Sequence, residues 1–309
     1  MAKVAKGDAR VQTGRGQAST VQKSKERIAT LRWVIIVSAV LVLAFLKVFW
    51  SRFQPAPERA TPSEVAAAAV SASAPDAPER LKVKVLSTRP HDPEAFTQGL
   101  VLDGDTMYES TGLNGKSSLR EADPRTGKVR RKLDVPSEYF AEGLALVDNR
   151  LIQLTWQEEK AFVYNRADFK KVGEFRYDGE GWGLCWDGTR LAMSDGSDRL
   201  TFRDPKTFAV QSILNVTLAG QPAKELNELE CVDGVVYANV WRTEDILRID
   251  PKDGRVTAVI DASGLLTPEE KQKADVLNGI AWNPKTKTFL ITGKLWPKMF
   301  EVQFVPAPR

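Results

Sequence analysis

Apolar and polar residues alternate in five related segments of the chain, each long enough for two short strands. In "FAEGLALVDNRLIQLTW" (Phe140–Trp156), an apolar strand is followed by an Asp-Asn turn and a second apolar strand. Alternation with a period of two around such turns is typical of β-hairpins. The other four segments are 96–112, 181–196, 226–241 and 277–293. After residue 80, only the short stretch 267–275 resembles a helix, so we predict an all-β domain over residues 81–309.

One residue changes from repeat to repeat while its surroundings stay similar. It stands before a Gly-Leu-like pair, at Gln98, Glu142, Trp182, Asn227 and Asn278. The spacings are 44, 40, 45 and 51 residues, which fall near the length of a four-stranded propeller blade. We therefore predict a five-bladed β-propeller. A β-sandwich is the alternative architecture, but it would not explain five matching hairpins.

The last repeat is one strand short, because the chain ends soon after Lys298–Val305. The segment Leu81–Thr88 precedes the first repeat and alternates as a strand does. We expect it to pair into the final blade and close the ring.

An apolar run at Trp33–Trp50 contains a single charge, Lys47. Eighteen such residues are near the lower limit for a transmembrane helix. Eight basic and two acidic residues precede the run, so the positive-inside rule predicts a cytoplasmic tail (1–32), an anchor (33–50) and an exported remainder. Residues 51–80, rich in Pro and Ala, are typical of a tether. A cleaved signal peptide and a buried core helix are the alternatives; the small-residue site at Ser71–Ala74 lies far beyond an ordinary cleavage region.

The formal net charge of +4 comes from the N-terminal tail, since residues 81–309 hold 32 basic and 34 acidic side chains. A slightly acidic domain gives no reason to expect nucleic-acid binding. The two cysteines and one histidine cannot supply a zinc site built from several such ligands, so we expect neither metal nor other cofactor. We expect Cys185 and Cys231 to be free and buried, although only their Cα distance could decide on a bridge.

The second strand of each hairpin returns antiparallel, so its end lies beside the start of the first strand. Side chains from both positions are therefore expected at one mouth of the ring. They comprise a carboxylate, three indoles, amides and an ammonium, from Glu142, Trp156, Trp182, Trp241, Gln98, Asn227, Asn278 and Lys294. A carboxylate among indoles has a raised pKa and can exchange protons near neutral pH. Amides and an ammonium can stabilise an oxyanion.

Ten short motifs run through the repeats in order. They are "FTQGL", "YESTG", "FAEGL", "QLTW", "GWGL", "SDGS", "LNELE", "ANVW", "LNGIAW" and "TGKLWP". Together they resemble the plant and bacterial type of glutaminyl-peptide cyclotransferase over essentially all of 81–309. The resemblance implies a five-bladed propeller that converts the N-terminal glutamine of peptides to pyroglutamate, releasing ammonia without a catalytic metal.

The resemblance also implies roles for individual residues. Glu142 of "FAEGL" would be the general acid and base. Asn227 and Lys294 would bind the γ-carboxamide or its oxyanion. The remaining pocket residues are implied to be Phe96, Gln98, Trp156, Trp182 and Trp241. Partners are then peptides with N-terminal glutamine and, through the anchor, a membrane; we expect a monomer with a periplasmic or extracellular catalytic domain.

Several other interpretations of the sequence are possible. His91 could serve a Ser-His-Asp triad but is better read as a turn residue at the blade entrance. Glu109, Glu228 and Glu230 are rival carboxylates. "SDGSD" (Ser194–Asp198) lacks a full calcium loop. The function could instead be a propeller that only binds protein, or a metal-dependent lactonase-like enzyme, although the latter needs several carboxylates at the mouth.

Overall fold

The computed structural model describes residues 77–308. In this range the chain forms 22 strands and one short helix, which confirms the prediction of an all-β domain. None of the helical structure in that range is long and apolar enough to cross a membrane. The predicted basic tail, the membrane helix and most of the linker lie outside the described residues.

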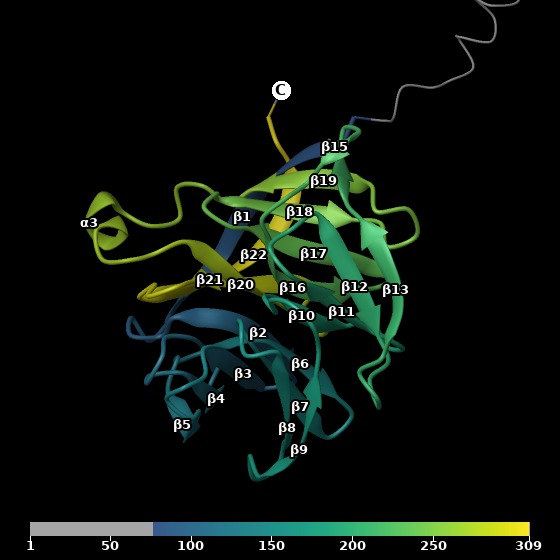
Figure 1. Cartoon of the computed structure of the whole chain (residues 1–309). Helices are drawn as coiled ribbons and strands as arrows, with labels where there is room; N and C mark the ends of the chain where they lie inside the picture. The colour runs from purple at the N-terminus through teal and green to yellow at the C-terminus, as the bar shows by residue number, and fades with distance from the viewer. Residues whose placement is uncertain (1–76, 309) are drawn as a thin grey trace, which may run out of the picture. The chain divides into compact units, whose positions relative to one another are not determined.

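Three sheets contain four antiparallel strands each, and every strand pairs with the next along the chain (Figure 1). The first sheet consists of β2 (Thr97–Asp103), β3 (Thr106–Thr111), β4 (Ser118–Ala122) and β5 (Val129–Asp134). The second consists of β6 (Ala141–Val147), β7 (Arg150–Thr155), β8 (Lys160–Asn165) and β9 (Lys171–Arg176). The third consists of β10 (Leu184–Trp186), β11 (Leu191–Ser194), β12 (Arg199–Arg203) and β13 (Val210–Asn215).

An eight-stranded sheet follows, with the strand order β16-β17-β18-β19-β1-β22-β21-β20. Its first half consists of β16 (Leu226–Val232), β17 (Val235–Val240), β18 (Asp245–Ile249) and β19 (Val256–Asp261). Its second half consists of β20 (Leu277–Asn283), β21 (Thr288–Gly293), β22 (Lys298–Pro306) and β1 (Glu79–Pro90). β1 pairs antiparallel with β22 and parallel with β19. The strand predicted at 81–88 therefore does complete the last repeat, and its parallel contact fuses two four-stranded groups into one sheet.

The connections add little regular structure. β14 (Thr217–Leu218) and β15 (Gln221–Pro222) form a small two-stranded sheet. The helix expected within 267–275 is the single turn α3 (Pro268–Lys271), which begins with a capping box between Thr267 and Glu270.

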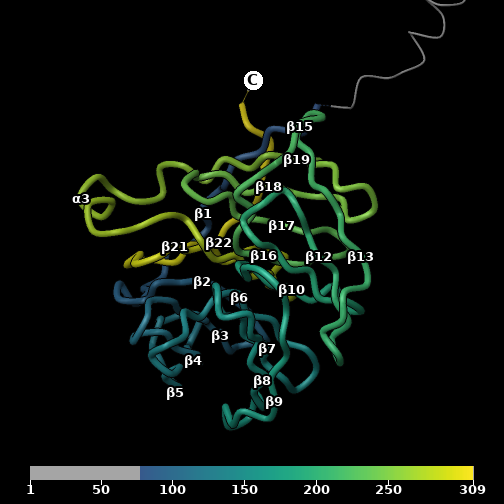
Figure 2. The backbone as a smooth tube through the Cα atoms, viewed as in Figure 1, coloured from purple at the N-terminus to yellow at the C-terminus, as the bar shows by residue number. Residues whose placement is uncertain are grey.

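The first strands of neighbouring sheets contact one another, and Figure 2 shows β2, β6, β10 and β16 close together near the middle of the domain. β2 lies beside β6 and β20, β10 lies beside β6 and β16, and β16 lies beside β20. Apolar clusters fill the spaces between neighbouring groups. One of them, for example, joins Ile152 and Leu154 of the second group to Leu184 and Leu191 of the third. Each group thus buries both faces only because it has a neighbour on each side.

The prediction of free cysteines is wrong. Cys185 on β10 and Cys231 on β16 form a disulfide with a Cα–Cα distance of 5.5 Å. Both residues lie on first strands, and these strands are neighbours around the centre. Sequence spacing alone could not reveal this contact, because 46 residues separate the two cysteines.

Candidate active site

A β-bulge lies at the changing residue in four of the five repeats. The pairing of the first two strands shifts register between Thr97 and Gly99, Ala141 and Leu144, Leu226 and Leu229, and Leu277 and Ile280. These shifts span Gln98, Glu142, Asn227 and Asn278. A bulge leaves one residue outside the regular ladder and re-aims its side chain. The repeated bulge thus places the changing residues where a strand would not otherwise point them.

The glycine that follows the changing residue lets neighbouring first strands approach closely. A Cβ on Gly143 would lie 2.6 Å from the backbone nitrogen of Leu184, and one on Gly183 would lie 2.0 Å from the carbonyl oxygen of Asn227. Neither distance is possible for a real side chain. The "GL" in these repeats is therefore explained by close packing around the centre.

The end of the second strand lies beside the start of the first, as expected from the sequence. Four backbone N–H groups donate to carbonyls across this junction, at 2.8–2.9 Å. The pairs are Gly112 to Phe96, Trp156 to Phe140, Trp241 to Glu225 and Lys294 to Val276. These bonds bring both sets of side chains to one end of the strands.

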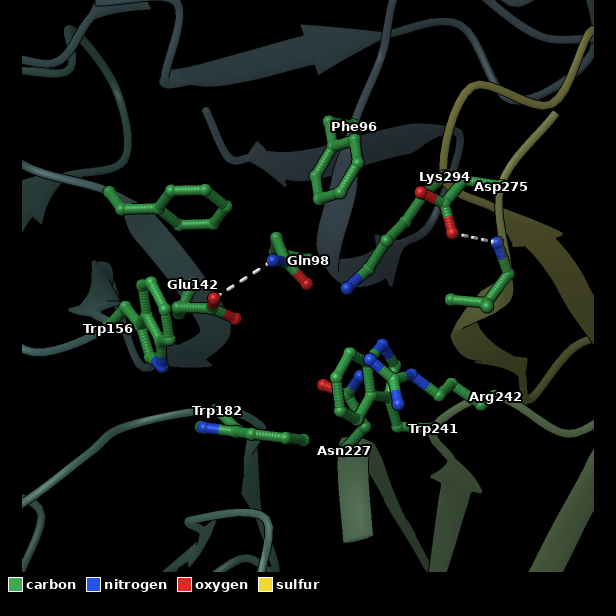
Figure 3. Close-up of a pocket in the computed structure, with 12 residues that line it drawn as sticks. Phe96, Gln98, Glu142, Trp156, Trp182, Asn227, Trp241, Arg242, Asp275 and Lys294 are labelled. Carbon is green, nitrogen blue, oxygen red and sulfur yellow. Dashed lines mark hydrogen bonds between the residues drawn. The ribbon is translucent and has the colours of Figure 1, made fainter. Parts of the chain in front are cut away.

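A pocket of about 400 Å³ lies at that end (Figure 3). The residues that line it are Phe96, Gln98, Phe140, Glu142, Trp156, Trp182, Asn227, Trp241, Arg242, Asp275, Val276 and Lys294. Eight of the nine residues expected at the mouth from the sequence are among them. The ninth, Asn278, does not line the pocket; its Nδ2 donates instead to Gln98 Oε1 at 3.1 Å.

Glu142 is one of two carboxylates that line this pocket; the other is Asp275. Its side chain is buried, with the residue 5% exposed, and its Oε1 accepts a hydrogen bond from Gln98 Nε2 at 2.9 Å. Burial raises the pKa of Glu142 well above its ordinary value, although the charge of Lys294 opposes the shift. A carboxyl group in this state can both take up and release a proton near neutral pH.

Two polar groups face the pocket without a partner. Lys294 is 5% exposed and forms no ion pair with any described residue, while its Nζ lies 4.9 Å from the centre of the Phe96 ring. Burial lowers the pKa of Lys294. Asn227 Oδ1 is buried and has no hydrogen-bond partner within 77–308. Both groups are therefore available to a ligand (Figure 3).

Five aromatic side chains, the aromatic wall, enclose the pocket: Phe96, Phe140, Trp156, Trp182 and Trp241. They make edge-on contacts in two groups. In one, ring centres lie 6.1 Å apart between Phe96 and Phe140 and 5.7 Å apart between Phe140 and Trp156. In the other, Trp182 and Trp241 are 5.5 Å apart. The aromatic wall makes the surroundings of Glu142 largely apolar.

Sequence reasoning missed four lining residues, namely Phe140, Arg242, Asp275 and Val276. Two of them had a signal in the repeats. Phe140 and Val276 stand two residues before Glu142 and Asn278, as Phe96 stands two residues before Gln98. Arg242 follows Trp241, and its guanidinium lies 3.9 Å from the centre of that indole ring. No repeat pattern marks Arg242 or Asp275.

The rival carboxylates do not line the pocket. Glu228 accepts backbone N–H groups of Leu100 at 3.2 Å and Ile280 at 2.8 Å. Glu230 accepts that of Trp282 at 2.7 Å. These bonds connect β16 to β2 and β20, so both carboxylates join first strands.

The third rival, Glu109, pairs with His91. His91 is buried, and its Nε2 lies 2.9 Å from Glu109 Oε1. Its Nδ1 lies 2.8 Å from the carbonyl oxygen of Trp296. His91 therefore does not line the pocket; it lies in the connection directly after β1, as expected, and its buried side chain fixes the chain there.

The described residues contain no group of three or more His, Cys, Asp or Glu side chains arranged to hold a metal ion. In "SDGSD", Asp195 accepts the backbone N–H of Ser197 at 3.0 Å and pairs with Arg199 at 2.8 Å. This segment is a polar turn.

Known proteins resemble this chain over most of its length. The sequence matches the glutamine cyclotransferase family over residues 60–304. It is 43% identical over 231 residues to the glutaminyl-peptide cyclotransferase of Arabidopsis thaliana, covering 73% of this chain and 72% of that protein. The crystal structure of Myxococcus xanthus glutaminyl cyclase is similar with a TM-score of 0.68 and 41% identity, covering 75% of this chain and all of the other. The chain therefore belongs to the glutamine cyclotransferase family.

Proposed function

We propose that this protein is a glutaminyl-peptide cyclotransferase, which cyclises the N-terminal glutamine of peptides to pyroglutamate and releases ammonia. One observation carries the proposal. A buried carboxyl group with a raised pKa, Glu142, shares an aromatic pocket with the unpaired ammonium of Lys294. Membership of the glutamine cyclotransferase family supports the same reaction.

The reaction requires that the substrate be held in the conformation that allows ring closure and that a proton be transferred. The substrate's α-amine attacks its own γ-carbonyl carbon, so a carbon–nitrogen bond forms within one molecule and the ring closes. The carbonyl oxygen becomes an oxyanion while the attacking nitrogen becomes cationic. The bond to the amide nitrogen then breaks, and that nitrogen leaves as ammonia once it has been protonated.

Glu142 is the proposed proton carrier. It takes the proton from the attacking amine and delivers it to the departing nitrogen, so no net proton is consumed. Lys294 is proposed to bind the oxyanion, and Asn227 Oδ1 to accept an N–H of the γ-carboxamide. Phe96, Trp156, Trp182 and Trp241 would enclose the glutamine side chain, and Gln98 would orient Glu142 through its hydrogen bond.

The direct test is turnover. The full-length protein, incubated with a Gln-initiated peptide, should release one ammonia per peptide and leave a product blocked to amino-terminal sequencing. A peptide beginning with Asn is the control, because its side chain is one carbon too short to close the same ring. Absence of ammonia with every Gln-peptide would reject the proposed function.

Activity should also survive EDTA, because the proposed steps use only side chains of this chain. Turnover would be compared before and after chelation and after adding back zinc or calcium. Loss on chelation with recovery on adding metal would instead favour the lactonase-like alternative. A protein that binds Gln-peptides without releasing ammonia would favour the binding-only alternative.

We further infer that the domain is a five-bladed propeller that is exported and held by an N-terminal anchor. The circle of contacts among β2, β6, β10, β16 and β20 supports five blades. The disulfide supports export, since such bonds persist in oxidising compartments. The apolar run at 33–50 and the basic residues before it support a cytoplasmic N-terminus. Fractionation of cells and size measurement of the purified protein test the anchor and the expected monomer.

A further inference from the structure

We propose that Glu180 is a positioning residue that joins the two groups of the aromatic wall and thereby sets the width of the substrate pocket. The inference rests on the proposed function, and Glu180 itself is not among the residues lining the pocket. The residue precedes β10 and stands two positions before Trp182. It thus occupies the same place in its repeat as Phe96 and Phe140 do in theirs.

The contacts of Glu180 are specific. Its Oε2 accepts hydrogen bonds from two indoles, Trp156 Nε1 at 2.8 Å and Trp182 Nε1 at 2.9 Å. Its Oε1 accepts a hydrogen bond from Gln157 Nε2 at 2.9 Å. One carboxylate therefore satisfies the only polar atom of each indole side chain.

The hydrogen bonds of Glu180 lie between the two groups of the aromatic wall. In the first group, Phe140 contacts both Phe96 and Trp156. In the second group, Trp182 contacts Trp241. Trp156 follows β7 and Trp182 precedes β10, so the two groups are carried by different sheets. Glu180 connects them, and the wall becomes continuous from the second sheet to the third.

The carboxylate is well suited to this task. Partial burial would raise the pKa of Glu180, but hydrogen bonds from Gln157, Trp182 and Trp156 lower it on balance. Glu180 is therefore ionised under conditions where Glu142 still exchanges a proton. Charge-assisted hydrogen bonds of this kind are roughly twice as strong as neutral ones.

Glu180 also acts on Glu142 through its charge. The groups that face Glu142 come from four segments: Lys294 after β21, Glu158 after β7, Tyr177 after β9 and Glu180 before β10. After burial, Lys294 lowers the pKa of Glu142, whereas Glu180 and Glu158 raise it. Removing the charge at position 180 should therefore make Glu142 more acidic.

Two variants separate the two effects. Glu180→Ala removes the acceptor, so both indoles lose their anchor, and KM for a Gln-peptide should rise roughly 10- to 100-fold with a smaller change in kcat. Glu180→Gln keeps an oxygen that can accept from the indoles but removes the charge. Its KM should stay near the wild-type value, while the acid limb of the profile of kcat/KM against pH should move to lower pH.

Glu159→Gln is the matched control, because it removes a nearby carboxylate that, within 77–308, accepts a hydrogen bond only from the backbone N–H of Gly179. It should leave KM and the pH profile unchanged. Wild-type KM and pH profile in both Glu180 variants would overturn the proposal, as would equal changes in the control.

A second readout does not depend on turnover. In the full-length chain with 15N-labelled tryptophan, the Nε1–H signals of Trp156 and Trp182 should shift in Glu180→Ala and stay in place in Glu159→Gln. Each signal is assigned by its loss in Trp156→Phe or Trp182→Phe. Unmoved signals in Glu180→Ala would reject the positioning role. Shifted signals in a chain that turns over no Gln-peptide would reject the proposed function and the pocket role, but not the contact.

Discussion

Glu142 owes its proposed chemistry to its surroundings rather than to its residue type. Glu109, Glu180, Glu228 and Glu230 also accept hydrogen bonds, but Glu142 is the glutamate that lines the pocket, where its neighbours are aromatic rings, amides, two basic side chains and Asp275. Glu109 has a buried histidine as partner, and the adjacent charge of His91 helps to lower its pKa against the effect of burial. Identical side chains thus hold a proton in one place and release it in another.

Glu142→Gln should lower kcat by roughly 10² to 10⁴, the usual range for general acid–base catalysis. The amide keeps the shape of the side chain but cannot carry the proton. Affinity for a substrate-like inhibitor should change little, because the aromatic wall remains. Steady-state kinetics and inhibitor titration measure both. Near wild-type turnover in Glu142→Gln, together with inactive Glu228→Gln, would move the proton carrier to another residue.

The sequence alone was sufficient to predict the pocket residues that occupy repeated positions. Gln98, Glu142, Trp182 and Asn227 could be found because the frame around them recurs. Glu180 occupies a repeated position too, but its role depends on two indole N–H groups contributed by different sheets. Arg242 and Asp275 lie in connections that have no counterpart in the other repeats, so only three-dimensional structure places them at the pocket.

At the scale of single elements, β16 departs from the other first strands. Where "FTQGL" and "FAEGL" have glycine after the changing residue, "LNELE" has Glu228. Its carboxylate reaches backbone N–H groups on β2 and β20, at 3.2 Å and 2.8 Å. The side chain that seemed a rival catalyst from sequence is a connection between strands. The hydrogen bonds of β16 could not be foreseen, because its partners lie 128 and 52 residues away.

Glu228 should make the stability of the domain fall as pH rises. Burial raises the pKa of Glu228 well above its ordinary value and that of Glu230 to about 8. The folded state therefore holds these protons more tightly than the unfolded state. The stabilisation is complete below the unfolded pKa, near 4.5, and is lost as pH rises through the folded pKa.

Glu228→Gln cannot ionise and keeps an acceptor oxygen, so its Tm should fall less than the wild-type Tm between pH 5 and pH 8. A difference of roughly 3 °C or more corresponds to about 1 kcal/mol in a domain of this size. Thermal unfolding followed by circular dichroism provides the measurement. The exposed Glu94 supplies the control, as Glu94→Gln should behave like wild type. If Tm changed equally with pH in the wild type, Glu228→Gln and Glu94→Gln, Glu228 would not be the group that makes stability depend on pH.

At the scale of the whole domain, neighbouring groups are held together mostly by apolar packing, and the Cys185–Cys231 bridge adds one covalent link. It closes a loop of 46 residues between the third sheet and the eight-stranded sheet. By the chain-entropy estimate, a loop of this length stabilises the folded state by about 4 kcal/mol.

Reducing agent should therefore lower the Tm of the wild-type protein by roughly 10 °C. The Cys185→Ala/Cys231→Ala double variant should begin from a lower Tm and show no further response. Its KM should remain near that of wild type, because neither cysteine lines the pocket. If reduction left the wild-type Tm unchanged, the bridge would not be contributing to stability.

The pairing of β1 with β22 also determines when the last repeat can be completed during synthesis of the chain. Ser87 donates a hydrogen bond to Glu301, 214 residues later in the chain, at 3.0 Å. Among the strands of this domain, the ribosome releases β1 first and its antiparallel partner β22 last, so β1 must wait until all the strands between them have been synthesised. Contacts this distant in sequence are slow to form, and unpaired strand edges are prone to aggregation in the meantime. A premature stop before Lys298 would leave β1 without that partner, even though every pocket residue had already been made.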